Sequence, residues 1–214
     1  MTLDCPDLQF PVKQCTREMA TPQGVLEKAE KDREVHVRVE AVKWLFAWQE
    51  EPKYCHFFAD SGWGGNIKDR KSTSGGVWML GGHCVKTRRA SQGPYALSSA
   101  EAEFYTMIEA VTRAKGLWSL AVEFGFKELS NVVHLGIDSS TAKSFVCRRG
   151  LGKMRHLEIR DLWLHKEVAE GKVLVEKVLG IENPVDSVTK LLGVRDIMER
   201  LERMNMRLIR RLES

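Results

Sequence analysis

Four acidic residues end apolar runs or begin helical segments, and these are positions from which side chains of separate elements can converge. They are Asp60, Glu103, Asp138 and Asp186. Aspartate is a poor strand residue, so an aspartate at the end of each of two apolar runs calls for a reason. Carboxylates brought to the same end of neighbouring elements repel one another unless a cation lies between them. A pair of divalent cations is the usual solution, and the placement therefore predicts metal-dependent phosphodiester cleavage.

Each of these residues also has a structural explanation that the sequence leaves open. Asp138 precedes a Ser-Ser-Thr run and Asp186 opens a helical segment, so either could be a helix N-cap. Asp60 could equally lie in a turn, and Glu103 could be an ordinary exposed glutamate on a helix. The spacing of the four residues along the chain is only weak evidence for a shared site, because it shows no more than that there is room for helices and strands between them.

Two glutamates compete for one place in this set, because Glu101 and Glu103 lie at the start of the same helical segment. Residues two positions apart point in widely different directions on a helix, so one of them is expected to serve the site. Ser98 with Glu101 fits the Ser-x-x-Glu capping box, in which the glutamate folds back to the start of the helix. This gives Glu101 a structural role and leaves Glu103 as the candidate metal ligand.

Basic residues gather in two short segments that could attract phosphates. One contains Arg148, Arg149, Lys153, Arg155 and His156 around a Gly-Leu-Gly stretch, and the other spans residues 68–71. A solvated surface explains either cluster equally well. His156 is also a candidate general acid, but it precedes a helix, which favours a structural or phosphate-binding role.

The elements that would position these residues follow from the spacing of apolar residues. Strands are expected over 54–60, 75–80, 84–87, 132–138 and 173–179, and helices over 99–123, 141–147, 156–170, from 186, and over 196–212. This mixture favours an α/β fold built on one central sheet. Residues 1–52 are interpreted as a helical lead-in, because apolar residues over 37–46 recur near helical spacing.

The bulk composition is that of an ordinary globular protein, with 214 residues, 43% apolar and 29% charged. No apolar stretch approaches the ~18 residues of a membrane span, so no membrane partner is expected. The start of the chain lacks the layout of a secretory signal. Five scattered cysteines without a Cys-x-x-Cys pair indicate neither a zinc ribbon nor a disulfide framework. We therefore expect a reduced, intracellular setting.

Six blocks of sequence resemble the RNase H domain of copia-type retrotransposon Pol polyproteins, in the order and spacing of that family. The blocks are DSGWGG at 60–65, RKSTSGGV at 70–77, ALSSAEAEF at 96–104, DSSTA at 138–142, RHLEIR at 155–160 and DSVTK at 186–190. The family's usual second aspartate after the first block's Asp60 is replaced here by Gly62. The resemblance covers about residues 54–192.

The resemblance implies an RNase H-like fold, with a central mixed five-stranded sheet flanked by helices. It implies that residues 1–52 are a helical tail of the preceding reverse transcriptase and that residues 53–192 are the RNase H-like domain. Residues 193–214, which the motifs do not cover, are expected from their spacing to form a C-terminal helix. The implied metal ligands are Asp60, Glu103, Asp138 and Asp186, with Mg²⁺ as two ions and Mn²⁺ as a substitute. Ser72 and Gln92, within and beside the resembling blocks, join the basic cluster as candidate contacts to nucleic acid.

The function implied is hydrolysis of the RNA strand of RNA–DNA hybrids during reverse transcription, with the reverse transcriptase of the same polyprotein as partner. The RNA would be told from DNA by contacts to its 2′-hydroxyls. Two alternatives stay open: an inactive, domesticated remnant that only binds nucleic acid, and an integrase or resolvase that cuts DNA. The Leu-Ser-Ser-x-Glu-Ala-Glu block favours RNase H over the latter.

Overall fold

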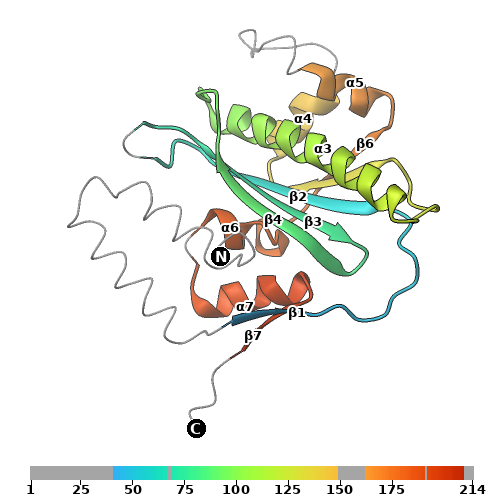
Figure 1. Cartoon of the computed structure of the whole chain (residues 1–214). Coiled ribbons are helices and arrows are strands. Elements are labelled where there is room, and N and C mark those ends of the chain that lie inside the picture. Colours follow the sequence, from blue (N-terminus) through green and yellow to red (C-terminus); the bar gives the residue numbers. More distant parts are fainter. Residues whose placement is uncertain (1–40, 67–68, 149–161, 191, 210–214) are drawn as a thin grey trace.

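A five-stranded sheet lies between two layers of other elements in this protein (Figure 1). The computed structural model describes residues 41–66, 69–148, 162–190 and 192–209. The elements in chain order are β1 (Ala41–Trp44), β2 (Cys55–Gly62), β3 (Thr73–Leu80), β4 (His83–Ser91), α3 (Ser99–Glu123), β5 (Val133–Ile137), α4 (Ser140–Cys147), α5 (Trp163–Ala169), β6 (Val173–Lys177), the 3₁₀ helix η2 (Gly180–Glu182), α6 (Asp186–Thr189), α7 (Val194–Arg203) and β7 (Met206–Ile209). None of the helices in these ranges has the length and apolar character needed to cross a membrane.

The sheet has the strand order β4-β3-β2-β5-β6. β4, β3 and β2 are antiparallel neighbours, whereas β2, β5 and β6 run parallel. A hairpin joins β3 to β4 at Gly81, whose positive φ of 61° is a conformation that glycine adopts without strain. The expectation of a mixed five-stranded sheet flanked by helices is confirmed.

Helices α3, α4 and α5 cover one face of the sheet (Figure 1). The core on this side includes Phe57 and Leu135 from the sheet and Phe104 and Met107 from α3. α3 begins where the sequence predicts, because the Ser98 hydroxyl accepts a hydrogen bond from the Glu101 amide. It ends before Gly125, which has a φ of 101°. Of the helix expected over 156–170, only the part from residue 162 lies within the described residues.

The opposite face is covered by α6, by α7 and by a small two-stranded sheet of β1 and β7. Ala41–Trp44 pairs antiparallel with Met206–Ile209, so the helix expected from the spacing over 37–46 is wrong in this part of the described chain. The helix expected over 196–212 is also wrong after Arg203, because the chain turns at Asn205, with φ 56°, and enters β7. Both errors have one cause: the pairing partners lie far apart in the sequence, where local spacing cannot show them.

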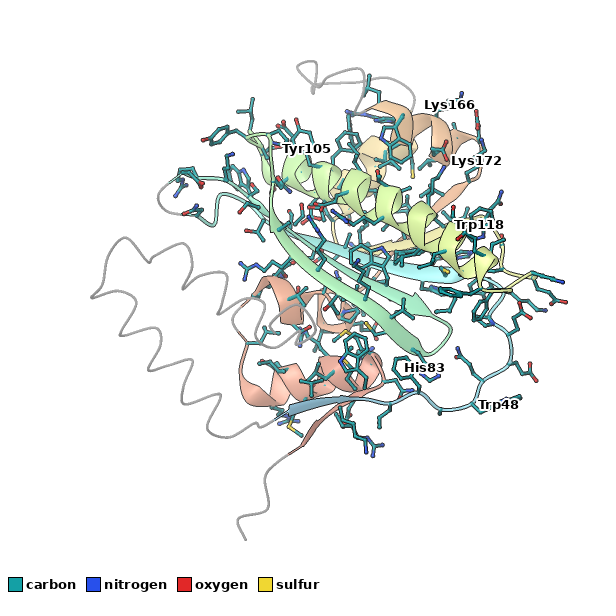
Figure 2. The ribbon with its side chains drawn as sticks, in the orientation of Figure 1. Trp48, His83, Tyr105, Trp118, Lys166 and Lys172 are labelled. Atoms are coloured by element: carbon teal, nitrogen blue, oxygen red, sulfur yellow. The ribbon has the colours of Figure 1, made fainter. Side chains whose placement is uncertain are left out.

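His83, at the start of β4, contacts the second layer, which consists of α6, α7, β1 and β7 (Figure 2). Its Nε2 lies 2.8 Å from the carbonyl oxygen of Ala47, and its Nδ1 lies 2.9 Å from Nδ2 of Asn205. The apolar cluster beneath combines Val77 of β3 with Val188 of α6 and Leu201 of α7. The second layer is therefore packed on the sheet by side chains and is not a loose appendage. The boundaries of the three predicted regions stay a prediction.

Candidate active site

The first two carboxylates meet because Asp60 lies near the end of β2 and Asp138 directly follows β5, the parallel neighbour of β2. The ladder between β2 and β5 pairs Cys55 with Val133 and Phe58 with Gly136. Continuing the same register by two residues sets Asp138 beside Asp60. In a parallel pair the carboxyl ends of both strands reach the same edge of the sheet. The apolar runs that end in an aspartate thus deliver the two side chains to one place.

The third carboxylate, Glu103, comes from the first turns of α3, which crosses above β2. Its Oε1 accepts hydrogen bonds from the Ser61 amide, at 3.2 Å, and from the Ser61 hydroxyl, at 2.9 Å. Its Oε2 is buried and has no hydrogen-bond partner. Ser61 therefore fixes one oxygen of Glu103, and the other is left for a ligand.

Asp60, Glu103 and Asp138 form a group in which one oxygen of each lies within 4.8 Å of the others. Asp60 and Glu103 are almost fully buried, at 2% and 7% exposure, while Asp138 is partly exposed. Three acidic oxygens so close together in a region of low dielectric repel one another strongly. The group has the donor chemistry that Mg²⁺ and Mn²⁺ prefer, since all its donors are carboxylate oxygens. The orphaned Oε2 of Glu103 is consistent with a cation at this position.

Burial and the repulsion between these carboxylates also change their pKa values. Burial raises the pKa of Glu103 to about 8, with further contributions from the nearby Asp60 and Asp138 carboxylates against the Ser61 hydrogen bonds. Burial likewise raises the pKa of Asp60 to about 6, although Lys190 and the Thr189 hydroxyl act in the opposite direction. Both groups therefore hold protons more tightly than usual as long as no cation balances their charge.

The structure resolves two of the alternatives that the sequence left open. The N-cap of α4 is Ser139, whose side chain accepts from the Ala142 amide, so Asp138 does not cap this helix. Glu101 accepts from the Leu97 amide at 2.9 Å and from the Tyr105 hydroxyl at 3.0 Å. Glu101 is thus engaged in holding the start of α3, and Glu103 is the member of the pair that joins the carboxylate group.

Asp186 lies at the start of α6, close to the group but outside the set of three. Buried Asn183 positions this segment, since its side-chain amide donates to the Ala59 carbonyl of β2 and accepts from the Val185 amide. Thr189, one turn after Val185, donates to Oδ2 of Asp60. The predicted four-carboxylate set is therefore present as three converging side chains and a fourth beside them.

Two cations that the sequence reading missed contact Asp186. The Lys190 ammonium lies 2.6 Å from its Oδ1, and Arg200 donates to its Oδ2 at 3.2 Å. Lys190 also lies 3.7 Å from Oδ2 of Asp60. The four-residue spacing of Asp186 and Lys190 was a signal for this pairing, because such residues are neighbours on a helix. Arg200 comes from α7, and no local signal connects it to the site.

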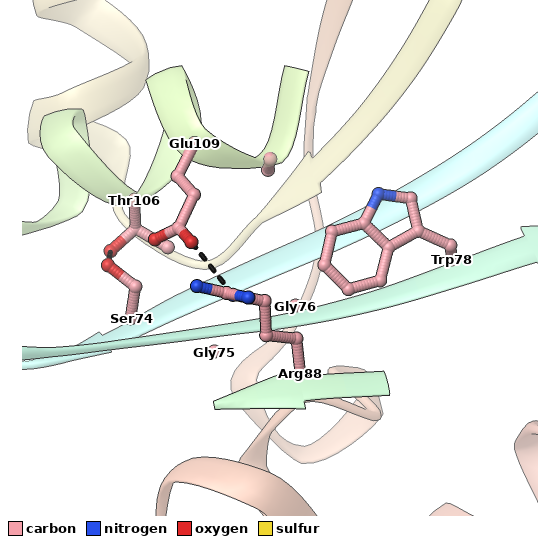
Figure 3. A pocket seen from close by; sticks show the side chains of 8 residues that line it. Ser74, Gly75, Gly76, Trp78, Arg88, Thr106 and Glu109 are labelled. Atoms are coloured by element: carbon pink, nitrogen blue, oxygen red, sulfur yellow. Dashed lines mark hydrogen bonds and ion pairs between the residues drawn. The ribbon is translucent and has the colours of Figure 1, made fainter. Parts of the chain in front are cut away.

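Ser72 and Gln92, predicted to contact nucleic acid, are buried and support the site from within. Ser72 accepts from the Gly64 amide, and Gln92 donates to Ser74, Thr106 and the carbonyl oxygen of Ala102. Figure 3 shows the Ser74 and Thr106 hydroxyls facing each other, 2.9 Å apart, beside the ion pair of Arg88 and Glu109. Ser72 and Gln92 are therefore internal supports, and neither forms part of an exposed contact surface.

Of the first basic cluster, which spans residues 148–156, Arg148 is the member that the structure describes. It is exposed at the end of α4, and its guanidinium carbon lies 4.7 Å from the centre of the Phe145 ring. Arg149, Lys153, Arg155 and His156 lie outside the described residues.

Three side chains that are exposed or partly exposed lie on the segments after β2, before β3 and after β4, and one of them, Lys71, comes from the second predicted basic segment. Trp63 follows the end of β2 and is 54% exposed, and its indole donates to the Ala96 carbonyl at 3.0 Å. The Lys71 ammonium lies 5.3 Å from the centre of the exposed Tyr95 ring. Trp63, Lys71 and Tyr95 thus form a partly exposed aromatic and cationic surface.

Comparison with known proteins finds relatives among transposon polyproteins, although no family model matches the chain. Over 138 residues it is 27% identical to the retrovirus-related Pol polyprotein from transposon TNT 1-94 of Nicotiana tabacum, a match that covers 63% of this chain and 10% of that protein. Over 140 residues it is 26% identical to the corresponding polyprotein from transposon RE2 of Arabidopsis thaliana, with 64% and 10% covered. The chain thus spans about a tenth of the length of these relatives.

Solved structures with a similar arrangement include RNase H1 from Halobacterium salinarum, at 17% identity and a TM-score of 0.43, covering 62% of this chain and 90% of that one. The N-terminal RNase H domain from Mycobacterium tuberculosis gives 18% identity and a TM-score of 0.45, with 64% and 90% covered. The sequence matches agree with the ordered motifs: the chain is similar to a part of retrovirus-related Pol polyproteins of plant transposons.

Proposed function

We propose that this chain is a ribonuclease H that hydrolyses the RNA strand of RNA–DNA hybrids with divalent cations, Mg²⁺ or Mn²⁺. The observation that carries the proposal is the convergence of three acidic side chains, from β2, α3 and the end of β5, within 4.8 Å of one another. The cost of burying this group is understandable if it binds a cation. The homology to Pol polyproteins supports the same class of activity.

Each side chain has a definite task in this proposal. Asp60, Glu103 and Asp138 would bind the first ion, and Ser61 would hold Glu103 so that its Oε2 faces that ion. Asp186 would complete the site of a second ion. Bound divalent ions would supply a water of lowered pKa as the nucleophile and would stabilise the departing 3′ oxygen.

Basic and aromatic side chains at the surface support a nucleic-acid substrate. Lys71 and Arg148 are cations that could contact phosphates, and exposed Trp63 and Tyr95 offer flat faces to a sugar or base. Contacts to 2′-hydroxyls would distinguish the RNA strand from DNA. Because the relatives are Pol polyproteins, we place this hydrolysis in reverse transcription, with the reverse transcriptase part of the same polyprotein as partner.

The experiment is cleavage of end-labelled substrates by the purified chain with Mg²⁺ or Mn²⁺. A hybrid labelled on its RNA strand should be cut, whereas duplex DNA of the same sequence should remain intact. Cleavage of the DNA duplex would indicate an integrase or resolvase instead. Binding of the hybrid without cleavage in either metal, at low and moderate salt, would show a remnant that only binds nucleic acid.

A further inference from the structure

Lys190 lies between two of the four predicted metal ligands. Its ammonium is 2.6 Å from Oδ1 of Asp186 and 3.7 Å from Oδ2 of Asp60. The other oxygen of Asp186 accepts from Arg200 at 3.2 Å. Both oxygens of Asp186 therefore already face a positive charge that belongs to the protein.

This arrangement divides the four carboxylates into two sets that share Asp60. Asp60, Glu103 and Asp138 converge on one point, and in this set no lysine or arginine ion pair is found for Glu103 or Asp138 among the described residues. Asp60 and Asp186 face the Lys190 ammonium instead. A divalent ion binding Asp60 and Asp186 together would come within a few ångströms of Lys190 and repel it strongly.

We propose that in the free protein the Lys190 ammonium occupies the second cation position of the site, so that only the position of Asp60, Glu103 and Asp138 takes a divalent ion. This inference rests on the proposed function, because it concerns the same carboxylates. Lys190 is a positioning residue here, since it acts through the charges of Asp60 and Asp186.

The two cations differ in their freedom to move. The Lys190 side chain is 45% exposed, whereas that of Arg200 is 8% exposed and also donates to the Asp196 carbonyl. Lys190 can therefore swing into solvent, while Arg200 holds Asp186 in place. A second divalent ion can enter only when Lys190 withdraws, and its affinity is lowered by the cost of that withdrawal.

The test counts ions on the free chain without any substrate. Mn²⁺ is titrated into the full-length protein, and the free ion is followed by its electron paramagnetic resonance signal. We expect one bound Mn²⁺ for the wild type and a second for Lys190→Met, with an affinity for that second ion raised at least about tenfold. Lys190→Arg, which keeps the charge, should behave like the wild type. Lys166→Met removes a lysine whose side chain is 74% exposed on α5 and should also leave the count at one (Figure 2).

The outcomes separate this inference from the proposed function. Two ions of similar affinity on the wild type, or an unchanged single ion on Lys190→Met, would overturn the role of Lys190 and leave the nuclease proposal standing. No bound ion on either protein would overturn both. Lys190→Gln provides the same comparison if circular dichroism shows that Lys190→Met does not fold.

Discussion

At the scale of single residues, the site is defined by carboxylates whose burial is unfavourable without a cation. Asp60 and Glu103 are both almost fully buried, and Glu103 has an oxygen without a hydrogen-bond partner. Without a bound cation, the protein can bury these carboxylates if they stay protonated. Cation binding and proton binding therefore compete for the same oxygens.

This competition predicts how the metal affinity depends on pH. The pKa of Glu103 is raised to about 8 and that of Asp60 to about 6, chiefly by burial. Because both pKa values are raised on folding, the metal-free protein is most stable below the ordinary carboxyl pKa and loses stability as the pH rises through 6 and then 8. Metal binding should displace these protons, so the Mg²⁺ affinity should increase from pH 6 to 8, by up to about tenfold per unit for each proton displaced.

Isothermal titration calorimetry with Mg²⁺, in buffers of different ionisation enthalpy at pH 6, 7 and 8, measures both the affinity and the protons released. An affinity that is independent of pH, with no proton release, would show that the carboxylates are already ionised in the metal-free protein.

Capping chemistry allowed the sequence to distinguish Glu103 from Glu101, because the Ser-x-x-Glu pattern assigns a structural role by local spacing alone. Lys190 could have been recognised in the same way, one helical turn after Asp186. Arg200 could not, since its contact depends on how α7 packs against α6. Nor could the burial of Gln92, which depends on hydroxyls of β3 and α3.

At the scale of elements, the site depends on how closely α6 approaches the sheet. Gly75 of β3 pairs with Asp60 of β2, and α6 packs directly over it. A Cβ atom at Gly75 would lie 2.2 Å from Cγ2 of Thr189 and 2.8 Å from Cγ1 of Val185. The absence of a side chain at this position brings Thr189 and Lys190 within reach of Asp60.

Gly75→Ala should therefore displace α6 and lower the free energy of unfolding by about 1–3 kcal/mol, because the site is too tightly packed for a methyl group. Gly116→Ala is the matched control. Gly116 lies in α3, and an added Cβ there would meet nothing within 4 Å, so this change should stabilise the chain by about 0.5–1 kcal/mol. Urea unfolding followed by circular dichroism measures both. Equal stability of the two variants would show that α6 does not need this close approach.

The large sheet and α3 were predictable because their signals are local: the spacing of apolar residues and a serine cap. β1 and β7 were not, since each is short and is paired with a strand at the other end of the described chain. Val42 and Trp44 pack against the second apolar cluster from alternate positions of β1, and so short a run also fits a helical spacing.

At the scale of the whole molecule, the segment after residue 192 forms part of the hydrophobic interior. Leu201 and Met204 of this segment are buried with Val77 and Met79 of the large sheet. Helix α7, which contains Leu201, also carries Arg200, and Arg200 forms an ion pair with Asp186. The second layer thus links the C-terminal segment to the candidate site through both packing and charge.

Leu201→Ala should reveal this contribution to stability. Leu201 is fully buried, so its truncation should lower the free energy of unfolding by about 2–5 kcal/mol, through lost burial and the cavity left behind. Met198→Ala on the same helix is the control, because Met198 is 40% exposed and its loss should change stability by no more than about 0.5 kcal/mol. If both variants unfold at the wild-type urea concentration, α7 is not part of the cooperative core.

The central claim is that Asp60, Glu103 and Asp138 together support divalent-ion-dependent cleavage of RNA in a hybrid. The most direct measurement is the single-turnover rate of hybrid cleavage by the wild type and by Asp138→Asn in Mg²⁺, with circular dichroism to verify that both are folded. Asp138 is partly exposed and caps no helix, so the substitution should leave the fold intact. We predict cleavage by the wild type and a loss of more than about a hundredfold in Asp138→Asn, beyond the effect of residues that only orient metal ligands. Equal rates for the two proteins, or no cleavage by a folded wild type, would contradict the claim.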